Sequence, residues 1–392
     1  MDHHPRVALR FMITVADHLD TSSGKPRLAA LDSLRGFASL AVLFGHTLTI
    51  CEWNSGFSRW LLVNNLFDGR SAVTMFFVLS GFVLTLGHLG ESRKPLNLVP
   101  FYARRATRIW LPWFAFFLLS LLAKTYFHFS YPQTIPPLTA YHLSFWTQDI
   151  NLIDVLRQMI FQLYNSERVL LPQDWSLGIE LRASLLIPFF LIFARKSWIV
   201  LAAAAWVIAW VKPSGGFYYA SFAIGVITAQ LHARQTYLVN SWVLLLVGYV
   251  LYQSRWIYEV ARLCPDCIGE REIWLIGAVG CGLLILAVLR SLKLRRILEH
   301  PLLAHLGRVS YSLYLVQMIV LLCLAPWIVK TFNTLGVLSG AWLQLLLLLA
   351  VTSLCLVLAD LGERWIEVPC IHLGRWITHR LEEIPLVRKL RV

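Results

Sequence analysis

Long apolar stretches recur along the chain and alternate with short polar segments. An α-helix rises 1.5 Å per residue, so about 20 apolar residues cross the roughly 30 Å of bilayer hydrocarbon. The pattern therefore predicts an all-α, polytopic membrane bundle of about ten transmembrane helices, at residues 28–50, 71–90, 109–128, 175–194, 197–211, 216–232, 237–253, 272–290, 309–329 and 339–361.

The positions of Lys and Arg predict how this bundle is oriented. An even number of spans puts both termini on one side, and the loops of that side carry most of the basic residues. The positive-inside rule then places the N- and C-termini in the cytoplasm. The predicted organisation is a cytoplasmic segment at 1–27, a membrane domain at 28–361 and a basic cytoplasmic tail at 362–392.

Composition excludes most other classes of protein. Of the 392 residues, 57% are hydrophobic and only 15% are charged, which is too apolar for soluble domains, disorder or a coiled coil. The net charge of +13 would suggest nucleic acid in a soluble protein, but the basic loops of a membrane protein explain it here. We expect membrane lipid as a partner and no nucleic acid.

The cysteines do not form a metal-binding pattern. Cys264 and Cys267 have the CxxC spacing, but a second CxxC or a pair of His residues is missing. We therefore expect no metal site, and a local disulfide if this loop faces an oxidising compartment. The proline-containing segment 129–174 includes an amphipathic stretch from Ile150 to Tyr164, which predicts an interfacial helix or a re-entrant piece.

Ionisable residues inside apolar spans are the strongest indication of a site, because placing them in lipid costs several kcal/mol. Arg35 and His46 lie about 20° apart around the first helix and about 16 Å apart along it. One face thus presents a cation toward the cytoplasm and an imidazole toward the outside. The alternatives are that Arg35 pairs with Asp32, and that His46 only packs between helices.

Glu180 lies near the outer end of the fourth predicted span, at about the depth expected for His46. A buried carboxylate beside a histidine can orient the imidazole and stabilise its protonated form. Arg182 follows only two residues later and points away from Glu180, so a local ion pair does not explain the carboxylate.

Two further segments allow two interpretations each. Ser80 and Gly81 permit close backbone approach in the second span, either for helix packing or for a ligand channel. Arg105 and Arg108 share a helical face before Pro112. Their guanidinium groups suit the phosphates of a cytoplasmic ligand, or they anchor the helix to lipid headgroups.

Together these segments resemble the integral-membrane acyltransferase 3 family, which includes O-acetyltransferases of O-antigens and exopolysaccharides. The resemblance runs colinearly from about Leu28 to Arg375 and rests on six elements: Leu31-Asp-Ser-Leu-Arg-Gly with His46, Phe76-Phe-Val-Leu-Ser-Gly-Phe82, the pair Arg105 and Arg108 before Pro112, Trp175-Ser-Leu with Glu180, Gly307-Arg-Val-Ser-Tyr-Ser-Leu-Tyr314, and Glu367-Val-Pro369.

The chain departs from the family pattern at two places. Many relatives have a His shortly after the Ser-Tyr-Ser-Leu-Tyr element, where this chain has Gln317. After Glu180, the run Leu181-Arg-Ala183 replaces the Glu-Gln-Phe that is common in relatives.

The resemblance implies an enzyme of the inner (plasma) membrane that moves an acyl group, most often acetyl, from acyl-CoA to a hydroxyl of a glycan or glycolipid on the outer side. We assign general-base catalysis to His46, with Glu180 orienting its imidazole. The donor, acyl-CoA (acetyl-CoA), is assigned to Arg35, Arg105, Arg108, Ser80 and Gly81. The acceptor is assigned to Trp175, Ser176, Tyr311 and Gln317, and Ser80 and Tyr311 are also candidate donors to the reaction's oxyanion.

Other functions stay open at this level. An acyl-histidine intermediate could replace direct transfer. The acceptor could be a cytoplasmic small molecule or a lipid precursor. A secondary transporter would also have about ten spans with a few buried charges, although no internal repeat is visible. A scaffold subunit of an export complex would tolerate neutralisation of the charged residues.

Overall fold

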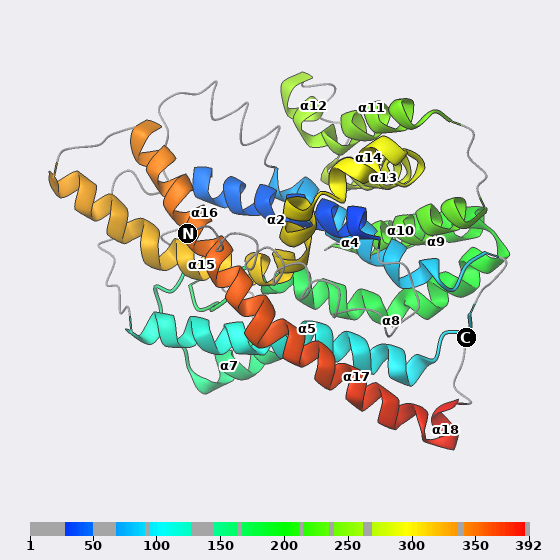
Figure 1. The fold of residues 1–392 in the computed structure, drawn as a ribbon, viewed down its shortest axis with the longest axis horizontal. Coiled ribbons are helices and arrows are strands. Elements are labelled where there is room, and N and C mark those ends of the chain that lie inside the picture. Colours follow the sequence, from blue (N-terminus) through cyan, green and yellow to red (C-terminus); the bar gives the residue numbers. More distant parts are fainter. Residues whose placement is uncertain are drawn as a thin grey trace, which may run out of the picture.

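The computed structural model describes residues 28–49, 68–90, 94–126, 144–162, 167–211, 215–234, 239–261, 269–335 and 341–388. The regular elements of these residues are all helices (Figure 1): α2 (Ala29–Thr49), α4 (Gly69–Leu86), α5 (Leu98–Tyr126), α7 (Leu152–Met159), α8 (Asp174–Lys196), α9 (Trp198–Val211), α10 (Gly216–Arg234), α11 (Ser241–Tyr252), α12 (Ser254–Ala261), α13 (Glu270–Arg290), α14 (Leu292–Leu298), α15 (Pro301–Leu335), α16 (Ala341–Gly362), the π-helix η2 (Glu363–Glu367), α17 (Val368–Glu382) and α18 (Pro385–Arg388).

The predicted all-helical class is confirmed for the described residues. Each of the ten predicted spans overlaps a helix, and six helices are long and apolar enough to cross a membrane by length and composition. The number ten and the cytoplasmic position of the termini stay predictions. The CxxC loop and the N-terminal segment lie outside the described residues.

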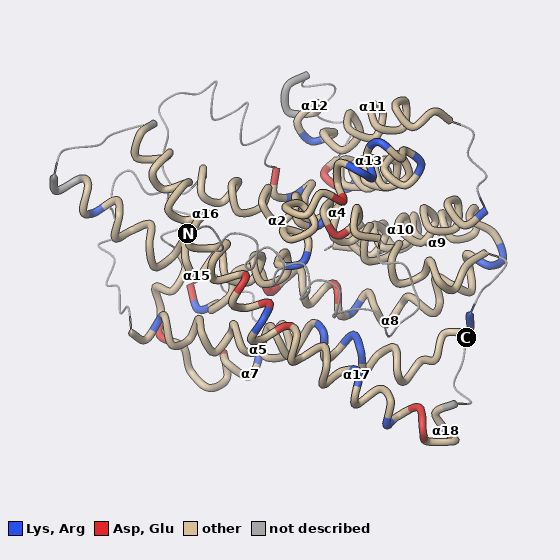
Figure 2. Tube along the Cα trace, in the orientation of Figure 1, with Lys and Arg blue, Asp and Glu red and all other residues tan. Residues whose placement is uncertain are grey.

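Two helices begin earlier than the hydropathy pattern predicts. Helix α5 begins at Leu98 and α15 at Pro301, so each extends beyond its predicted apolar span into a charged segment, and in α5 this segment carries Arg105 and Arg108 on one helix as their spacing predicts. In α5, Glu180 of α8 pairs with Arg105 and offsets the cost of its charge, whereas Arg308 of α15 shares a hydrogen bond with His305 one turn away on the same helix. Figure 2 shows charged residues gathered near the centre of the bundle, where α5, α8 and α15 pass one another.

The C-terminal part continues the bundle instead of leaving it. Helices α16, η2 and α17 follow one another without a break from Ala341 to Glu382, as the long diagonal element of Figure 1 shows. Helix α17 lies along α5, where the missing side chain of Gly374 makes room for Thr107. The segment predicted as a cytoplasmic tail therefore packs, at least as far as α17, against the helix that carries Arg105 and Arg108.

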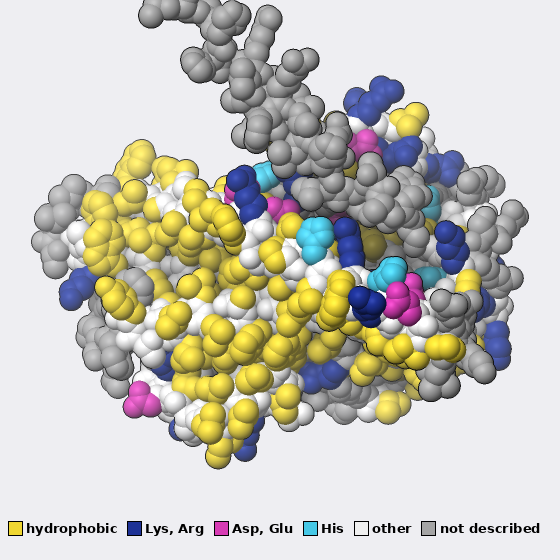
Figure 3. Space-filling view, turned by 60° about the horizontal axis from the view of Figure 1, so that its bottom comes forward, with side chains coloured by type: hydrophobic (Ala, Val, Ile, Leu, Met, Phe, Trp, Pro, Cys, Tyr) yellow, Lys and Arg dark blue, Asp and Glu magenta, His cyan; other side chains and the backbone are white. Residues whose placement is uncertain are grey.

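Helix α7 forms within the predicted amphipathic stretch. Its apolar side chains Leu152, Ile153 and Leu156 are exposed, whereas Asp154 and Gln158 are buried. This inverted pattern is expected for a helix whose apolar face meets lipid and whose polar face meets protein. Figure 3 shows a broad hydrophobic surface on the face of the molecule that it presents, which is typical of a lipid-facing protein.

Glycines set the closest helix contacts. A Cβ on Gly36 would lie 2.8 Å from the backbone nitrogen of Gly307, which brings α2 and α15 together. A Cβ on Gly81 would lie 2.1 Å from the carbonyl oxygen of Phe222, and one on Gly225 would lie 2.2 Å from that of Val78. Gly81 therefore serves the packing of α4 on α10, which is the packing interpretation of this residue.

We expect Gly81→Ala to destabilise the protein by about 1–3 kcal/mol, because the added methyl group overlaps a backbone oxygen that cannot move aside cheaply. The thermal unfolding midpoint in detergent measures this effect. Gly69→Ala is the matched control, since its Cβ would be 3.9 Å from the nearest atom. Equal midpoints for the two variants would contradict the close α4–α10 packing.

Candidate active site

Arg105 and Glu180 form the central ion pair of the bundle. Nη2 of Arg105 lies 2.6 Å from Oε1 of Glu180, and the two side chains are only 11% and 19% exposed. The same carboxylate oxygen accepts a hydrogen bond from Oγ of Ser80 (3.0 Å), and Nε of Arg105 donates to Oγ of Ser184 (3.0 Å). Helices α4, α5 and α8 meet in this one network, which fixes the guanidinium plane.

Arg35 and Arg108 lie close to this pair. Arg35 forms an ion pair with Asp32 at 3.7 Å, as the local alternative predicts, and also interacts electrostatically with Glu180. Arg108 stands among charges of both signs, with Arg35 and Arg105 on one hand and Asp32 and Glu367 on the other.

Arg108 differs from its neighbours in its exposure and in its ion pairing. Its side chain is solvent-accessible although α2, α5 and η2 surround it, and within the part of the chain that the structure describes it makes no ion pair shorter than 4.0 Å. An accessible, unpaired guanidinium among buried charges is suited to bind an anion.

The register of α2 against α15 gives the level of His46. Ser39 donates a hydrogen bond to the carbonyl oxygen of Ser310, 271 residues later, and Gly36 packs on Gly307 with the same offset. The helices therefore run parallel, and this offset puts His46 at the level of Gln317. Glu180 lies toward the other end, near Arg35. The pairing of Glu180 with His46 stays a prediction, and the contacts that the structure gives to Glu180 are Arg105 and Ser80.

The structure changes the predicted position of Arg105 relative to Glu180. Sequence placed Arg105 on the cytoplasmic side and Glu180 near the outer surface, but their direct contact puts them at one level. The reason is the early start of α5, which carries Arg105 two turns into the helix and opposite the middle of α8.

The remaining predicted residues divide into two groups. Tyr311 donates its hydroxyl to the carbonyl oxygen of Ile109 (2.6 Å), and Ser176 shares a hydrogen bond with the hydroxyl of Tyr314 (2.7 Å). Gln317 donates its amide to the carbonyl oxygen of Tyr314 (3.2 Å). These groups lie where α5, α8 and α15 meet. Trp175 is instead 37% exposed, and its ring lies 5.3 Å from that of Tyr218.

The comparison with protein families agrees with this arrangement. The sequence model of the acyltransferase domain family matches residues 28–360, which is most of the chain. The chain belongs to the acyltransferase 3 family. Comparison with curated proteins and with solved structures found no match. Family and fold together indicate an acyltransferase built from membrane-type helices.

Sequence reasoning missed two carboxylates of this acyltransferase as site candidates. Glu367, in the π-helix η2, accepts hydrogen bonds from both the backbone nitrogen (2.7 Å) and the hydroxyl of Ser312. Asp174 accepts a hydrogen bond from Nε1 of Trp113. Both are buried; Glu367 begins one of the segments that carry the family resemblance and Asp174 directly precedes another, so their charge in an apolar setting was the available signal.

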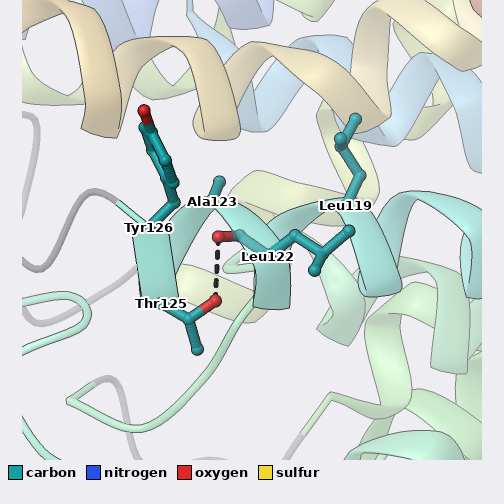
Figure 4. Close-up of a pocket in the computed structure, with 5 residues that line it drawn as sticks. All are labelled: Leu119, Leu122, Ala123, Thr125 and Tyr126. Atoms are coloured by element: carbon teal, nitrogen blue, oxygen red, sulfur yellow. Dashed lines mark hydrogen bonds between the residues drawn. The ribbon is translucent and has the colours of Figure 1, made fainter.

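An open pocket lies away from this network. It is lined by the last turns of α5, where Leu119 and Tyr126 point away from the helix and Thr125 donates to the carbonyl oxygen of Leu122 (2.9 Å) (Figure 4). Its lining is mainly apolar, which fits a depression in a lipid-facing surface. Within the described ranges, no group of three or more His, Cys, Asp and Glu side chains is arranged to hold a metal ion.

Proposed function

We propose that the protein is an acyl-CoA-dependent O-acyltransferase that moves an acyl group, most often acetyl, to a hydroxyl of a cell-surface or lipid-linked glycan at the outer side of the inner membrane. The observation that carries the proposal is the accessible Arg108 beside Arg35 and the Arg105–Glu180 pair, in a chain of the acyltransferase 3 family.

The arginines are suited to the nucleotide end of coenzyme A. Guanidinium groups bind phosphate oxygens with two parallel hydrogen bonds, and Arg108 has these donors available. Arg105 keeps donors for a ligand while Glu180 and Ser184 hold its orientation. From Arg35 to His46 the helix rises about 16 Å, which is comparable to the pantetheine arm. A thioester held in this way would arrive at the level of His46.

His46 then acts as the general base in direct transfer. The acceptor oxygen attacks the thioester carbonyl carbon, and its proton moves to the imidazole. The tetrahedral intermediate collapses as the carbon–sulfur bond breaks, and the thiolate of coenzyme A takes up the proton. Ser80 and Tyr311 are candidate oxyanion donors, and each would have to turn its hydroxyl away from its present acceptor, Glu180 or the carbonyl of Ile109.

Glu180 contributes in the proposal mainly by holding Arg105. The earlier hypothesis that Glu180 orients the imidazole predicts that Glu180→Gln shifts the pH profile of transfer, whereas a role in donor binding raises the KM for acyl-CoA and leaves the profile unchanged.

Mass spectrometry of surface glycans and envelope lipids tests the function as a whole. Cells with the intact protein should show a fixed mass increment of one acyl group on one class of molecule, and cells with His46→Ala should lack it. The increment names the acyl group and the molecule that carries it names the acceptor. Flux of a solute through proteoliposomes without acyl-CoA, with no acylated product, would show a transporter instead.

We expect Arg108→Lys to raise the KM for acetyl-CoA by about tenfold or more, because a lysine replaces a two-point contact with phosphate by a single charge. Initial rates at varied acetyl-CoA concentration measure the effect. Arg104→Lys is the control, since Arg104 is half exposed and forms only a loose pair with Glu382 at 3.9 Å. A KM that both variants leave unchanged would mean that Arg108 does not hold the donor.

A further inference from the structure

A second polar cluster lies along the same helices as the charged network, but it is neutral apart from one carboxylate. Gln173 donates its amide to the carbonyl oxygens of Tyr314 (3.1 Å) and Leu315 (2.7 Å), and Gln317 donates to the same carbonyl of Tyr314 (3.2 Å). Both amides therefore converge on one turn of α15. Asp174, the next residue of α8, bonds to Trp113 of α5.

Three oxygen atoms of this cluster have no hydrogen-bond partner among the described residues: Oε1 of Gln173, Oδ2 of Asp174 and Oε1 of Gln317. The three residues are only 4%, 4% and 1% exposed. Turning either side-chain amide by 180° would not give its oxygen a partner. The backbone carbonyl oxygens that the amides contact are acceptors, so they must face the amide nitrogen. The unpaired groups are thus all acceptors, and together they require donors.

The cluster lies at the level of the predicted base. The register of α2 on α15 puts His46 at the level of Gln317. Arg105, which pairs with Glu180, lies about 12 Å back along α5 from Trp113, the partner of Asp174. A buried acceptor without a donor costs free energy, and the described residues contain such oxygens outside this cluster as well, for example Oε1 of Gln230. Three unpaired oxygens on adjoining turns of α8 and α15 indicate a binding site in which a ligand supplies the missing hydrogen-bond donors.

We propose that Gln173, Asp174 and Gln317 hold the acceptor of the reaction by taking hydrogen bonds from its hydroxyl groups, and so present one of them to His46. This inference rests on the proposed function. Hydroxyl groups supply the donors that the three oxygens lack, and a carboxylate with two amide oxygens disfavours an anion. The site thus separates the two substrates by charge, with the phosphorylated donor at the arginines and a neutral polyol at this cluster.

The test uses 1-propanol, 1,2-propanediol and glycerol, which share a three-carbon chain and differ in the number of hydroxyl groups. Release of coenzyme A from acetyl-CoA by the purified full-length protein gives kcat/KM for each alcohol. Saturation-transfer NMR measures binding of the same alcohols without any reaction, so that binding and catalysis are judged separately.

Two variants remove two of the three unpaired oxygens with little change in volume. Asp174→Asn keeps the oxygen that Trp113 needs and replaces Oδ2 by an N–H donor, and Gln317→Met removes the amide. Gln230→Met is the matched control, because Gln230 is equally buried, donates to the carbonyl of Ala194 at the far end of α8, and also has an unpaired Oε1. Thermal unfolding midpoints show whether each variant is folded.

In the wild type, kcat/KM and NMR saturation should rise with each added hydroxyl, by about tenfold from 1-propanol to glycerol. In Asp174→Asn and Gln317→Met, kcat/KM and saturation should no longer rise with the number of hydroxyl groups, while Gln230→Met behaves as the wild type.

Equal saturation of the three alcohols in the wild type, or an unchanged series in both variants, would overturn the inference. If no alcohol releases coenzyme A but glycerol binding still depends on Asp174 and Gln317, the polyol site stands and the proposed function fails.

Discussion

Replacing His46 by Ala is expected to reduce acyl transfer by about 10²–10⁴-fold, because a positioned general base contributes a factor of this size. The imidazole is the base in the proposed mechanism, and water in the vacated space is a weaker and less well oriented base. The measurement is transfer of labelled acetyl from acetyl-CoA to the acceptor, in membranes that contain equal amounts of each variant.

The control for this variant is a histidine outside the network. His379 of α17 is exposed and lies near Glu383, so His379→Ala should keep nearly normal activity. His46→Ala should retain membrane insertion and a thermal midpoint near that of the wild type. Near-normal acyl transfer by a folded His46→Ala protein would remove this residue from the mechanism. Trapping with labelled acetyl-CoA and no acceptor then distinguishes direct transfer from an acyl-histidine, which alone would label the protein.

The second large effect is expected at the central ion pair. Arg105→Gln or Glu180→Gln alone should destabilise the protein by up to about 3–5 kcal/mol, since each leaves the other charge largely buried without its partner. The double variant should be more stable than either single one, because neither charge remains. All three should bind acetyl-CoA more weakly if the pair orients Arg105 toward the donor.

Thermal midpoints at one scan rate and a double-mutant cycle measure the coupling of the pair. The exposed pair of Arg104 and Glu382 serves as the comparison, and its coupling should be within about 0–1 kcal/mol. If the Arg105–Glu180 coupling were equally small, the pair would not be a fixed part of the site. Normal acetyl-CoA binding by the folded double variant would assign the donor to other residues.

The central pair also indicates how charges persist in an apolar bundle. Two of its arginines face an opposite charge on another helix or one turn away: Arg105 faces Glu180, and Arg35 faces Asp32. Arg108 has no such close partner among the described residues, and its nearest carboxylates act on it from a greater distance. An unbalanced cation in this setting is therefore the residue that most depends on a bound anion.

Much of the fold followed from hydropathy. Stretches of about 20 apolar residues have few alternatives to a helix in lipid, because the backbone must satisfy its own hydrogen bonds there. The pattern failed at helix ends that carry charge, as in α5 and α15, since hydropathy treats Arg105 or Arg308 as a residue in water. The carboxylate that offsets the charge of Arg105 is Glu180, which lies 75 residues away in the sequence, so a local pattern does not show it.

The sequence predicted which residues belong to the candidate site better than it predicted which of them contact one another. His46, Glu180, Arg35, Arg105 and Arg108 stood out because ionisable groups are costly in apolar spans. Their spacing within one helix gave local geometry, such as the separation of Arg35 and His46. It could not show that Glu180 contacts Arg105 of another helix, or that Gly81 serves packing against Phe222.

The chain's amino-acid order by itself determined the helical class, the family and the set of polar residues kept in apolar surroundings. Only the tertiary structure decided which of them meet: Arg105 with Glu180, Glu367 with Ser312, and Gln173 and Gln317 on one carbonyl of α15. The physical reason is that helix formation depends on neighbours within a few residues, whereas contacts between helices depend on the register and close approach that glycines such as Gly36 and Gly307 permit.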